Sequence, residues 1–481
     1  MTTDAEICWM TALELGARIA AGELSSEQVV RAHLDRIEQL NPVLEAYVTV
    51  VADRALAQAR ERDRELAAGR SRGALHGVPY SLKDIFATRG IRTTAGSSIL
   101  ADWVPNEDAT AVSLLTEAGA VLLGKVNTHE FAFGVTTHNQ HGRTKNPWHP
   151  ERIAGGSSGG SGAALAAGLC PFSLGSDTAG SIRLPAAFTG IAGLKPTYGR
   201  TSLHGVVAQS LSADHVGPMA RSVADLAAVL QIIAGQDPRD PESSAEPIGA
   251  YLGGLGEGIE GLRIGVPREL FGIGLEPGVS RAFTAAREVF AHLGARVSEV
   301  SAPLLAEASA INNAIVPPET AAQHLDWAAD WFSGRTIAYG EDVEILLAMG
   351  RAVPAIETIR ASRRRKRLRA QIEDVLRTEV DLLLTPTVAV AATDPGDATV
   401  TLNGRTLDLL NVLIHFLCGF SITGVPALAV PSGFDEYGLP VGVQLIGRAF
   451  DEATVLRAGH AFERATTWCM ARPPLATADA T

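Results

Sequence analysis

The chain has 481 residues, of which 46% are hydrophobic and 20% charged, a composition that excludes a disordered or fibrous protein and predicts a large globular core. Its formal net charge of -12 at pH 7 argues against nucleic-acid binding as the main function. Four scattered cysteines without metal-ligand spacing favour a protein of the reducing cytoplasm.

Two segments bear on targeting and membrane insertion: the N-terminal end and one uncharged stretch. Residues 1–6 lack the basic stretch and apolar run of a signal peptide, so we expect a cytoplasmic location. The stretch from Leu409 to Val430 carries no formal charge, but it contains glycines, polar residues and Pro426. Because these residues interrupt an apolar helix, we expect a buried helix, a turn and a strand there, and no membrane association.

Periodicity and glycine turns predict the elements in chain order. Ser25 and Gln28 form a capping-box pattern within a helical region at 12–40. Further helices are expected at 52–68, 161–168 and 280–293, strands at 120–124, 172–175, 261–266, 381–385 and 427–430, and a surface loop at 242–260. Strands that alternate with helices predict an α/β fold with a central, mostly parallel sheet.

Two glycine-rich segments that contain serines, at 155–161 and 175–183, are the strongest functional signal. Glycine lets the backbone approach a substrate carbonyl and point its N–H groups at a developing oxyanion. Upstream, Lys83 has apolar neighbours, and burial lowers the pKa of a lysine until it can act as a neutral base. A lysine and two serines suffice for nucleophilic catalysis, so we expect a hydrolase without metal or cofactor.

These segments resemble the signature of the amidase signature family of serine hydrolases. Matched residue by residue, Lys83 takes the place of the family's catalytic lysine, Ser157 that of a bridging serine on a cis peptide, and Ser181 that of the nucleophile. The resemblance implies a relay in which Lys83 deprotonates Ser157 and Ser157 deprotonates Ser181. It also implies that the product is released through an acyl-enzyme on Ser181.

The similarity covers roughly residues 10–465 and includes stretches at 193–200, 214–219, 424–428 and 438–444. It implies the fold of that family, a mixed β-sheet covered by helices on both faces. We expect one domain over residues 1–481, with a signature core at about 75–220 and a more variable region at about 240–410.

The resemblance assigns the oxyanion hole to a short run of backbone N–H groups, those of Thr178, Ala179, Gly180 and Ser181. Three neighbours are expected to support the site structurally rather than enter the chemistry: Ser158, Asp177 and Arg183. Asp177 would hold the turn through backbone hydrogen bonds, and Arg183 would neutralise its charge.

Four phenylalanines are candidates to line an apolar acyl pocket, although core packing explains them equally well. They are Phe131, Phe133, Phe416 and Phe420. The sequence does not identify the substrate.

Other interpretations of the glycine-rich segment at 155–161 are weaker. A flexible linker is disfavoured because an alanine-rich helix former follows directly. The pattern also matches the nucleophile elbow of α/β-hydrolases, in which Ser157 would be the nucleophile. That fold requires a strand before the elbow, and residues 150–154 make a poor strand.

Two further clusters invite functional interpretations that the sequence does not favour. His129, His138, His141 and His149 lie close together, but the second ligand of a zinc-protease motif is missing, so we expect no metal site. The arginine-rich stretch at 363–369 is interpreted as the solvated face of a long helix rather than a nucleic-acid contact.

The sequence therefore predicts hydrolysis of a small-molecule amide, with release of a carboxylic acid and ammonia or an amine. Two alternatives stay open: a carbamate or ester hydrolase with the same triad, and the glutaminase component of a tRNA-dependent amidotransferase. The tyrosine-rich segment of that component has no match between Tyr339 and Arg369. No nucleic-acid or membrane partner is expected, and a homodimer is left open.

Overall fold

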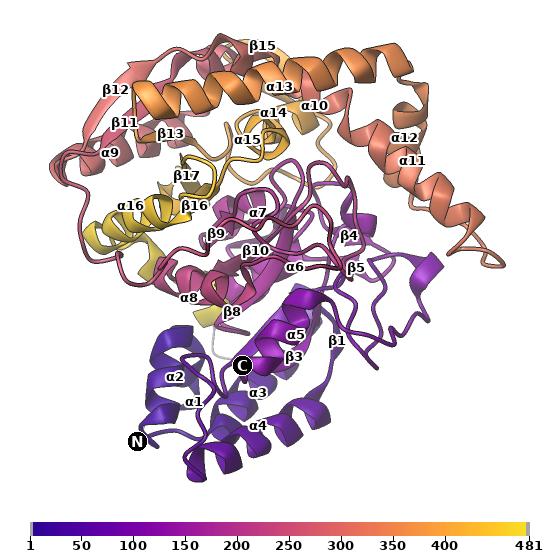
Figure 1. Cartoon of the computed structure of the whole chain (residues 1–481), viewed down its shortest axis with the longest axis vertical. Coiled ribbons are helices and arrows are strands. Elements are labelled where there is room, and N and C mark those ends of the chain that lie inside the picture. Colours follow the sequence, from indigo (N-terminus) through magenta and orange to yellow (C-terminus); the bar gives the residue numbers. More distant parts are fainter. Residues whose placement is uncertain (1–2, 478–481) are drawn as a thin grey trace.

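One eleven-stranded β-sheet runs through the computed structural model, which describes residues 3–477 (Figure 1). In spatial order its strands are β1 (Tyr47–Val50), β3 (Val121–Val126), β2 (Pro79–Lys83), β8 (Phe172–Asp177), β10 (His215–Ala220), β9 (Ala192–Lys195), β16 (Ala427–Phe434), β17 (Pro440–Ile446), β13 (Leu382–Pro386), β11 (Arg263–Pro267) and β12 (Arg296–Val300). Three small two-stranded sheets lie outside it: β4 (His138–Asn139) with β5 (Gly142–Arg143), β6 (Lys145–Asn146) with β7 (His149–Ile153), and β14 (Thr399–Leu402) with β15 (Arg405–Asp408).

The sheet is mixed, which confirms the predicted α/β class, but parallel pairs are the minority. Four neighbouring pairs are parallel and six are antiparallel. The expected predominance of parallel pairs followed from the alternation of strands and helices. Strands in the middle of the sheet instead reverse direction, as where the turn at 435–438 joins β16 to β17.

Helices cover both faces of the sheet. In chain order they are α1 (Asp4–Trp9), α2 (Ala12–Ala20), α3 (Ser26–Leu44), α4 (Ala52–Ala67), α5 (Thr110–Glu117), α6 (Gly159–Ala166), α7 (Arg183–Thr189), α8 (Val223–Ile233), α9 (Pro277–His292), α10 (Ala308–Asn313), α11 (Val316–Ala329), α12 (Glu341–Ala352), α13 (Ala355–Thr378), α14 (Leu409–Ile414), α15 (Cys418–Ile422), α16 (Glu452–Ala465) and α17 (Pro474–Thr477). One hydrophobic core packs α2, α5, α8 and α16 against the sheet, and another packs α3, α4 and α6. A third core lies beneath α10, α13, α14 and α15.

Local sequence signals account for several boundaries. The Ser25 hydroxyl accepts a hydrogen bond from the N–H of Gln28 and caps α3, as the pattern predicts. The expected strands at 120–124, 172–175 and 427–430 correspond to β3, β8 and β16. The uncharged stretch at 409–430 forms α14, α15 and the start of β16, all largely buried. Of the helices in the described part of the chain, none is long and apolar enough to cross a membrane.

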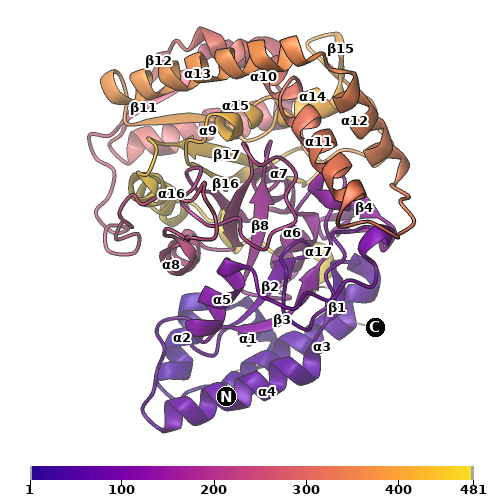
Figure 2. The same ribbon diagram turned by 45° about the vertical axis from the view of Figure 1, so that its right-hand side comes forward.

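The register of two central strands positions the candidate site. β2 and β8 are parallel neighbours, with Ser81 opposite Ser173 and Leu82 opposite Leu174. Their carboxyl ends therefore meet at one edge of the sheet, the edge at which ligands bind in open α/β folds. Lys83 ends β2 and Asp177 ends β8. Figure 2 shows these strands in the central part of the molecule, with α11 and α12 to the right in this view and α13 across the top.

Candidate active site

Lys83 lies at this edge, bonded to two serines. Its Nζ donates a hydrogen bond of 2.6 Å to Ser157 Oγ and one of 2.9 Å to Ser176 Oγ. The side chains of Lys83 and Ser157 are fully buried, and that of Ser176 is almost so. The structure thus joins the first two residues of the predicted triad and adds Ser176, which the sequence did not single out.

Burial lowers the pKa of Lys83 to about 7, against the opposing influence of the carboxylates of Asp214 and Asp177. A charged ammonium loses its hydration in the protein interior, and no carboxylate forms a direct ion pair with Lys83 in the described chain to restore it. Near neutral pH a substantial fraction of Lys83 is therefore uncharged. In that form its nitrogen can accept a proton from the neighbouring hydroxyl.

The segment before α6 brings Ser157 to the lysine. The Gly156–Ser157 peptide bond is cis. A Cβ on Gly156 would lie 2.7 Å from the backbone carbon of Val135, so only glycine fits there without displacing the chain. Ser158 donates two hydrogen bonds of 3.2 Å, from its N–H to the carbonyl oxygen of Ser181 and from its hydroxyl to the carbonyl oxygen of Ser176. Ser158 therefore ties the two serine-bearing segments together.

A buried ion pair shapes the segment that carries Ser181. Arg183 donates to both carboxylate oxygens of Asp177, from Nε at 3.0 Å and from Nη2 at 2.9 Å. The same carboxylate accepts hydrogen bonds from the N–H groups of Gly180 at 2.8 Å and Ile182 at 3.2 Å. Burial alone would raise the pKa of Asp177, but Arg183 overrides it and holds that pKa well below its usual range. The carboxylate is thus a permanently charged anchor for the turn.

Ser181 reaches closer to solvent than the other two serines and the lysine, with 9% of its surface exposed against 0% for Lys83 and Ser157. Of the four predicted oxyanion donors, the N–H of Gly180 is already bonded to Asp177. For the N–H groups of Thr178, Ala179 and Ser181, no acceptor is found within the described residues. These groups, among them those of Ala179 and Ser181 next to the nucleophile position, are free to bind an oxygen of a ligand.

Thr178 and Asp214 form a contact that no sequence pattern indicated. Thr178 Oγ1 donates to Asp214 Oδ1 at 2.6 Å, and the N–H of Gln209 donates to the other carboxylate oxygen at 2.7 Å. Asp214 opens one of the stretches that carry the family resemblance, but its local sequence does not show that it faces Thr178. The register of β10 against β8, which pairs His215 with Asp177, brings the two residues together.

The four candidate pocket phenylalanines are all buried, with 0% to 5% of their surface exposed. Phe131 packs edge-on against His324, and Phe416 packs edge-on against Phe271. Phe133 belongs to a small core with Val343. Such contacts are those of core residues, and a role in substrate binding stays a prediction for these side chains.

A cavity of about 180 Å³ lies beside the Ser157 segment, because its wall includes Val135, which contacts Gly156. One side of the cavity comes from the signature core and the other from the variable region and α14. Its lining residues are Val135, Thr136, Ile153, Thr393, Asp394, Pro395, Asp397, Ala398, Asp408, Leu409, Leu410 and Leu413. No pattern in the sequence predicted this hollow.

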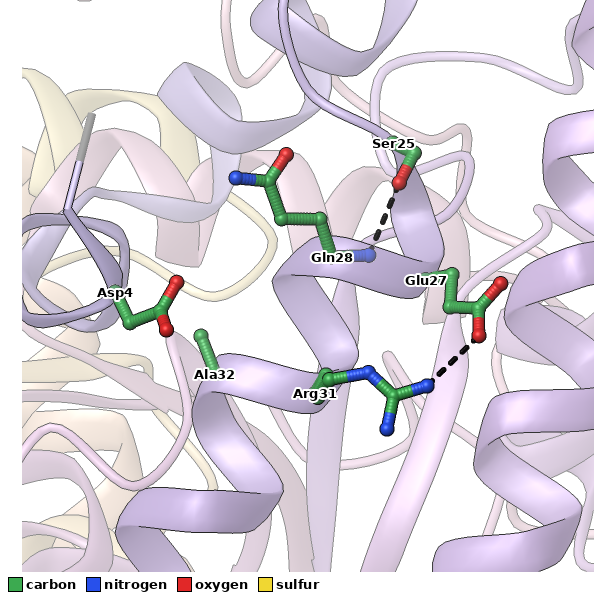
Figure 3. Close-up of a pocket in the computed structure, with 6 residues that line it drawn as sticks. All are labelled: Asp4, Ser25, Glu27, Gln28, Arg31 and Ala32. Carbon is green, nitrogen blue, oxygen red and sulfur yellow. Dashed lines mark hydrogen bonds and ion pairs between the residues drawn. The ribbon is translucent and has the colours of Figure 1, made fainter. Parts of the chain in front are cut away.

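A larger hollow of about 290 Å³ lies on the N-terminal helices and contains none of the predicted catalytic residues (Figure 3). Two pairs of its polar groups are bonded within the wall: Arg31 bonds Glu27 at 2.9 Å, and the Gln28 N–H bonds the Ser25 hydroxyl at 3.0 Å. We assign no function to it.

The histidine and arginine clusters have structural partners. His129 Nε2 lies 2.8 Å from a carboxylate oxygen of Asp342. Across residues 3–477, no group of three or more histidine, cysteine or acidic side chains is placed to hold a metal ion. On α13, Arg369 pairs with Glu373 and Arg365 donates to Ser212.

A buried lysine bonded to a serine, next to a turn with free N–H groups, is an arrangement suited to a hydrolase that performs acyl transfer without histidine. The family model described as Amidase matches residues 28–456, and the chain belongs to this family of amide-hydrolysing enzymes.

Relatives within the family include proteins of different stated function. The chain is 43% identical over 492 residues to the A subunit of the glutamyl-tRNA(Gln) amidotransferase of Chloroflexus aurantiacus, covering 98% of this chain and 99% of the relative. A structure from a vestigial protein complex, reported to reveal the origins of an s-triazine catabolic enzyme, matches with a TM-score of 0.88, 36% identity and coverage of 95% and 98%. A 6-aminohexanoate cyclic dimer hydrolase in complex with substrate matches with a TM-score of 0.88, 28% identity and coverage of 98% and 100%.

The Asp177–Arg183 pair predicts a pH-dependent loss of stability in Arg183→Met. The variant leaves a buried carboxylate unpaired, which should lower the free energy of unfolding at pH 7 by about 3–5 kcal/mol. In the native protein the pKa of Asp177 is lower than in the unfolded chain, where it is near 4. The ionised carboxylate therefore stabilises the fold at pH values above about 4, and this stabilisation is lost as the pH falls below that value. In the variant the unpaired carboxylate should have a raised pKa, so the difference between the two proteins should grow from pH 4 to pH 7. Urea unfolding at each pH measures it.

The control for this variant is Arg281→Met, which removes an exposed pair with Glu436 and should change stability by less than about 1 kcal/mol. A deficit in Arg183→Met that stays constant across this pH range would contradict the role assigned to the pair.

Proposed function

We propose that the protein hydrolyses a carboxylic amide through an acyl-enzyme on Ser181, with Lys83 as base and Ser157 as the proton carrier between them. The observation that carries the proposal is the 2.6 Å hydrogen bond from Lys83 Nζ to Ser157 Oγ in a fully buried setting. A neutral lysine at this distance can take the hydroxyl proton directly. The hydrogen bond from Ser158 to the Ser181 carbonyl supports the proximity of the two serine segments.

In this mechanism Lys83 takes a proton from Ser157, and Ser157 takes one from Ser181 as Ser181 attacks the carbonyl carbon. The oxyanion receives hydrogen bonds from the N–H groups of Ala179 and Ser181, and each of these bonds lowers the activation barrier by on the order of 3 kcal/mol. Ser157 then protonates the leaving amine and regains a proton from Lys83, which becomes neutral again. Water, deprotonated through the same relay, attacks the acyl-enzyme and releases the carboxylic acid.

The proposed substrate is a small-molecule amide or carbamate. The proposed mechanism uses no metal and no nucleic-acid partner. Carbamates and esters remain candidate substrates because the same acyl transfer serves all three. A cytoplasmic location is also part of the proposal. The question of a homodimer is left open.

A second candidate function is that of the glutaminase component of a tRNA-dependent amidotransferase. The similarity to the Chloroflexus aurantiacus amidotransferase chain over nearly the whole of both proteins favours it. Against it, the segment from Tyr339 to Arg369, which forms α12 and most of α13, lacks the expected tyrosine-rich pattern. The match to a hydrolase of a cyclic amide dimer supports the first candidate.

A fluorophosphonate probe should label the native protein at Ser181, because only an activated serine hydroxyl attacks the phosphorus atom at a useful rate. Peptide mapping by mass spectrometry locates the label. Ser181→Ala should show neither label nor amide turnover, and its thermal unfolding should match that of the native protein because the truncation removes one hydroxyl. A label on Ser157 would contradict the assignment and favour the nucleophile-elbow interpretation.

The pH profile of kcat/KM should have an acid limb near pH 7, because protonation of Lys83, with its pKa of about 7, removes the base. Activity should persist on the alkaline side. Lys83→Ala should lower kcat/KM by about 10²- to 10⁴-fold, the usual contribution of a general base. The control is replacement of Lys145, which lies outside the site and should leave the acid limb in place. An acid limb that stays unchanged in Lys83→His would show that a group other than Lys83 produces it.

The purified chain alone, without tRNA, nucleotide or a partner protein, should cleave a simple aryl or aliphatic amide at a saturable rate. The reason is that the lysine, the serines and the free N–H groups of the proposed mechanism all come from this chain. A mass-spectrometric screen against aryl amides, aliphatic amides, carbamates, esters and glutamine measures it, with Ser181→Ala as the matched control. Release of ammonia from glutamine, with no cleavage of any other amide, would favour the second candidate.

A further inference from the structure

Asp214 lies at the catalytic edge of the sheet, the edge where β2 ends at Lys83 and β8 ends at Asp177, and it has no role in the mechanism above. It directly precedes β10, whose first residue, His215, is paired with Asp177 at the end of β8. This register places its carboxylate beside the turn that follows β8. One oxygen accepts the hydrogen bond from Thr178 Oγ1 at 2.6 Å, and the other accepts one from the Gln209 N–H at 2.7 Å.

The Asp214 carboxylate is buried, with 4% of the residue exposed. Within residues 3–477 no lysine, arginine or histidine nitrogen lies at ion-pair distance from it. Asp177, by contrast, is bonded twice to Arg183. The charge of Asp214 therefore has no direct ion-pair partner, and it acts on charged groups farther away.

One of these groups is Lys83. Burial lowers the pKa of Lys83, and Asp214 is the first of the two carboxylates that oppose the shift. Burial also raises the pKa of Asp214 to about 6, while Lys83 is among the groups that oppose this shift. Other charged or titratable groups also lie around the pair. Asp177 is bonded to Arg183, and Glu319 and Arg365 are bonded to serines of the 209–214 loop. His215 contacts the Asp177 carbonyl oxygen through Nδ1 at 3.0 Å, and Lys195 donates to the carbonyl oxygens of Pro196 and Val425.

The loop that leads to Asp214 is fixed by two helices of the variable region. Glu319 of α11 accepts a hydrogen bond from Ser212 Oγ at 2.8 Å and another from the Ser210 hydroxyl. Arg365 of α13 donates to Ser212 Oγ at 2.6 Å and to its carbonyl oxygen at 3.0 Å. Because the loop is bonded on both sides, the Asp214 carboxylate has a fixed position from which to hold Thr178.

We propose that Asp214 is a positioning residue for amide hydrolysis with two effects: it holds Thr178, and with it the N–H groups of Ala179 and Ser181, and its buried carboxylate, which has no ion-pair partner, acts on Lys83 at the same edge of the sheet. The inference rests on the proposed function, because it assigns Asp214 to the same lysine and the same turn.

The second effect predicts a direction of change in the pH profile that a purely structural role would not produce. A negative charge near Lys83 favours the ammonium and so raises the pKa of the lysine above the value that burial alone would set. Removal of that charge in Asp214→Asn should lower the pKa of Lys83 and move the acid limb of kcat/KM to lower pH by about one unit. Loss of structure alone would reduce activity by the same factor at every pH.

The first effect is tested through the partner of the carboxylate. Thr178→Val removes the hydroxyl while keeping the shape of the side chain, and should lower kcat/KM about tenfold, since a displaced oxyanion donor loses part of its contribution. Thr178→Ser keeps the hydroxyl and should retain activity within about threefold. Rescue by serine separates the hydrogen bond from the packing of the side chain.

The charge on Lys83 can be measured without turnover. Few lysines are present, at positions 83, 125, 145, 195 and 366. In protein labelled with ¹³C-lysine, the Cε resonance of Lys83, assigned by its absence in Lys83→Ala, should titrate about one pH unit lower in Asp214→Asn than in the native protein. Asp225→Asn is the matched control, because Asp225 is also buried and also accepts two hydrogen bonds, in its case from the backbone N–H groups of Ala12 and Leu13. It should leave the Lys83 titration unchanged.

The outcomes distinguish the inference from the proposed function. A Lys83 titration and an acid limb that stay in place in Asp214→Asn, together with full activity of Thr178→Val, would overturn the inference while leaving the hydrolase mechanism intact. A native protein that cleaves no amide would overturn the proposed function, and the resonance of Lys83 would still report whether Asp214 controls its charge. A shift in Asp225→Asn as large as that in Asp214→Asn would also overturn the inference.

Discussion

Burying the Asp177 carboxylate together with the Arg183 guanidinium constrains most of the geometry around the site. Two charges removed from water are tolerated only when their hydrogen-bonding groups are satisfied. Asp177 therefore binds the N–H groups of Gly180 and Ile182, and Arg183 reaches Gln444 Oε1 of β17 at 2.8 Å. These bonds join the end of β8, the start of α7 and the second half of the sheet. The turn that carries Ser181 has little freedom to move within this frame.

The two buried cation systems of the site differ in a way that matters for proton transfer. Arg183 is held against the Asp177 carboxylate in a bidentate pair, which suits a structural role. Lys83 bonds only to hydroxyl groups, and its carboxylate neighbours act on it from beyond ion-pair distance. A lysine paired directly with a carboxylate would keep its proton at neutral pH. The separation of Lys83 from Asp214 and Asp177 thus allows the same edge of the sheet to hold a fixed charge and a mobile proton.

Sequence reasoning found what depends on local chemistry and missed what depends on strand register. Glycine, serine and an isolated lysine pointed to the segments that meet around Lys83 and Ser157, and the capping of α3 by Ser25 followed from a short pattern. The direction of the central strands did not follow, because it depends on how each connection crosses the sheet. Asp214 was missed for the same reason, since only the pairing of β10 with β8 places it beside Thr178. The phenylalanines were ambiguous because apolar residues of a core and of a pocket look alike in sequence.

The proposed chemistry and the choice of substrate come from different parts of the chain. Lys83, Ser157 and Ser181 lie in the signature core, on elements that the fold shares with a hydrolase of a cyclic amide dimer at a TM-score of 0.88. The cavity beside the Ser157 segment draws one wall from that core and the other from residues such as Thr393, within the variable region, and Leu413, just beyond it. A carbonyl held by the turn at Ser181 would be the same for any amide, whereas the groups attached to it would meet residues outside the core. Substrate preference can therefore diverge between relatives whose sheet and catalytic edge stay alike, so that similarity over the whole chain identifies the reaction class more reliably than the substrate.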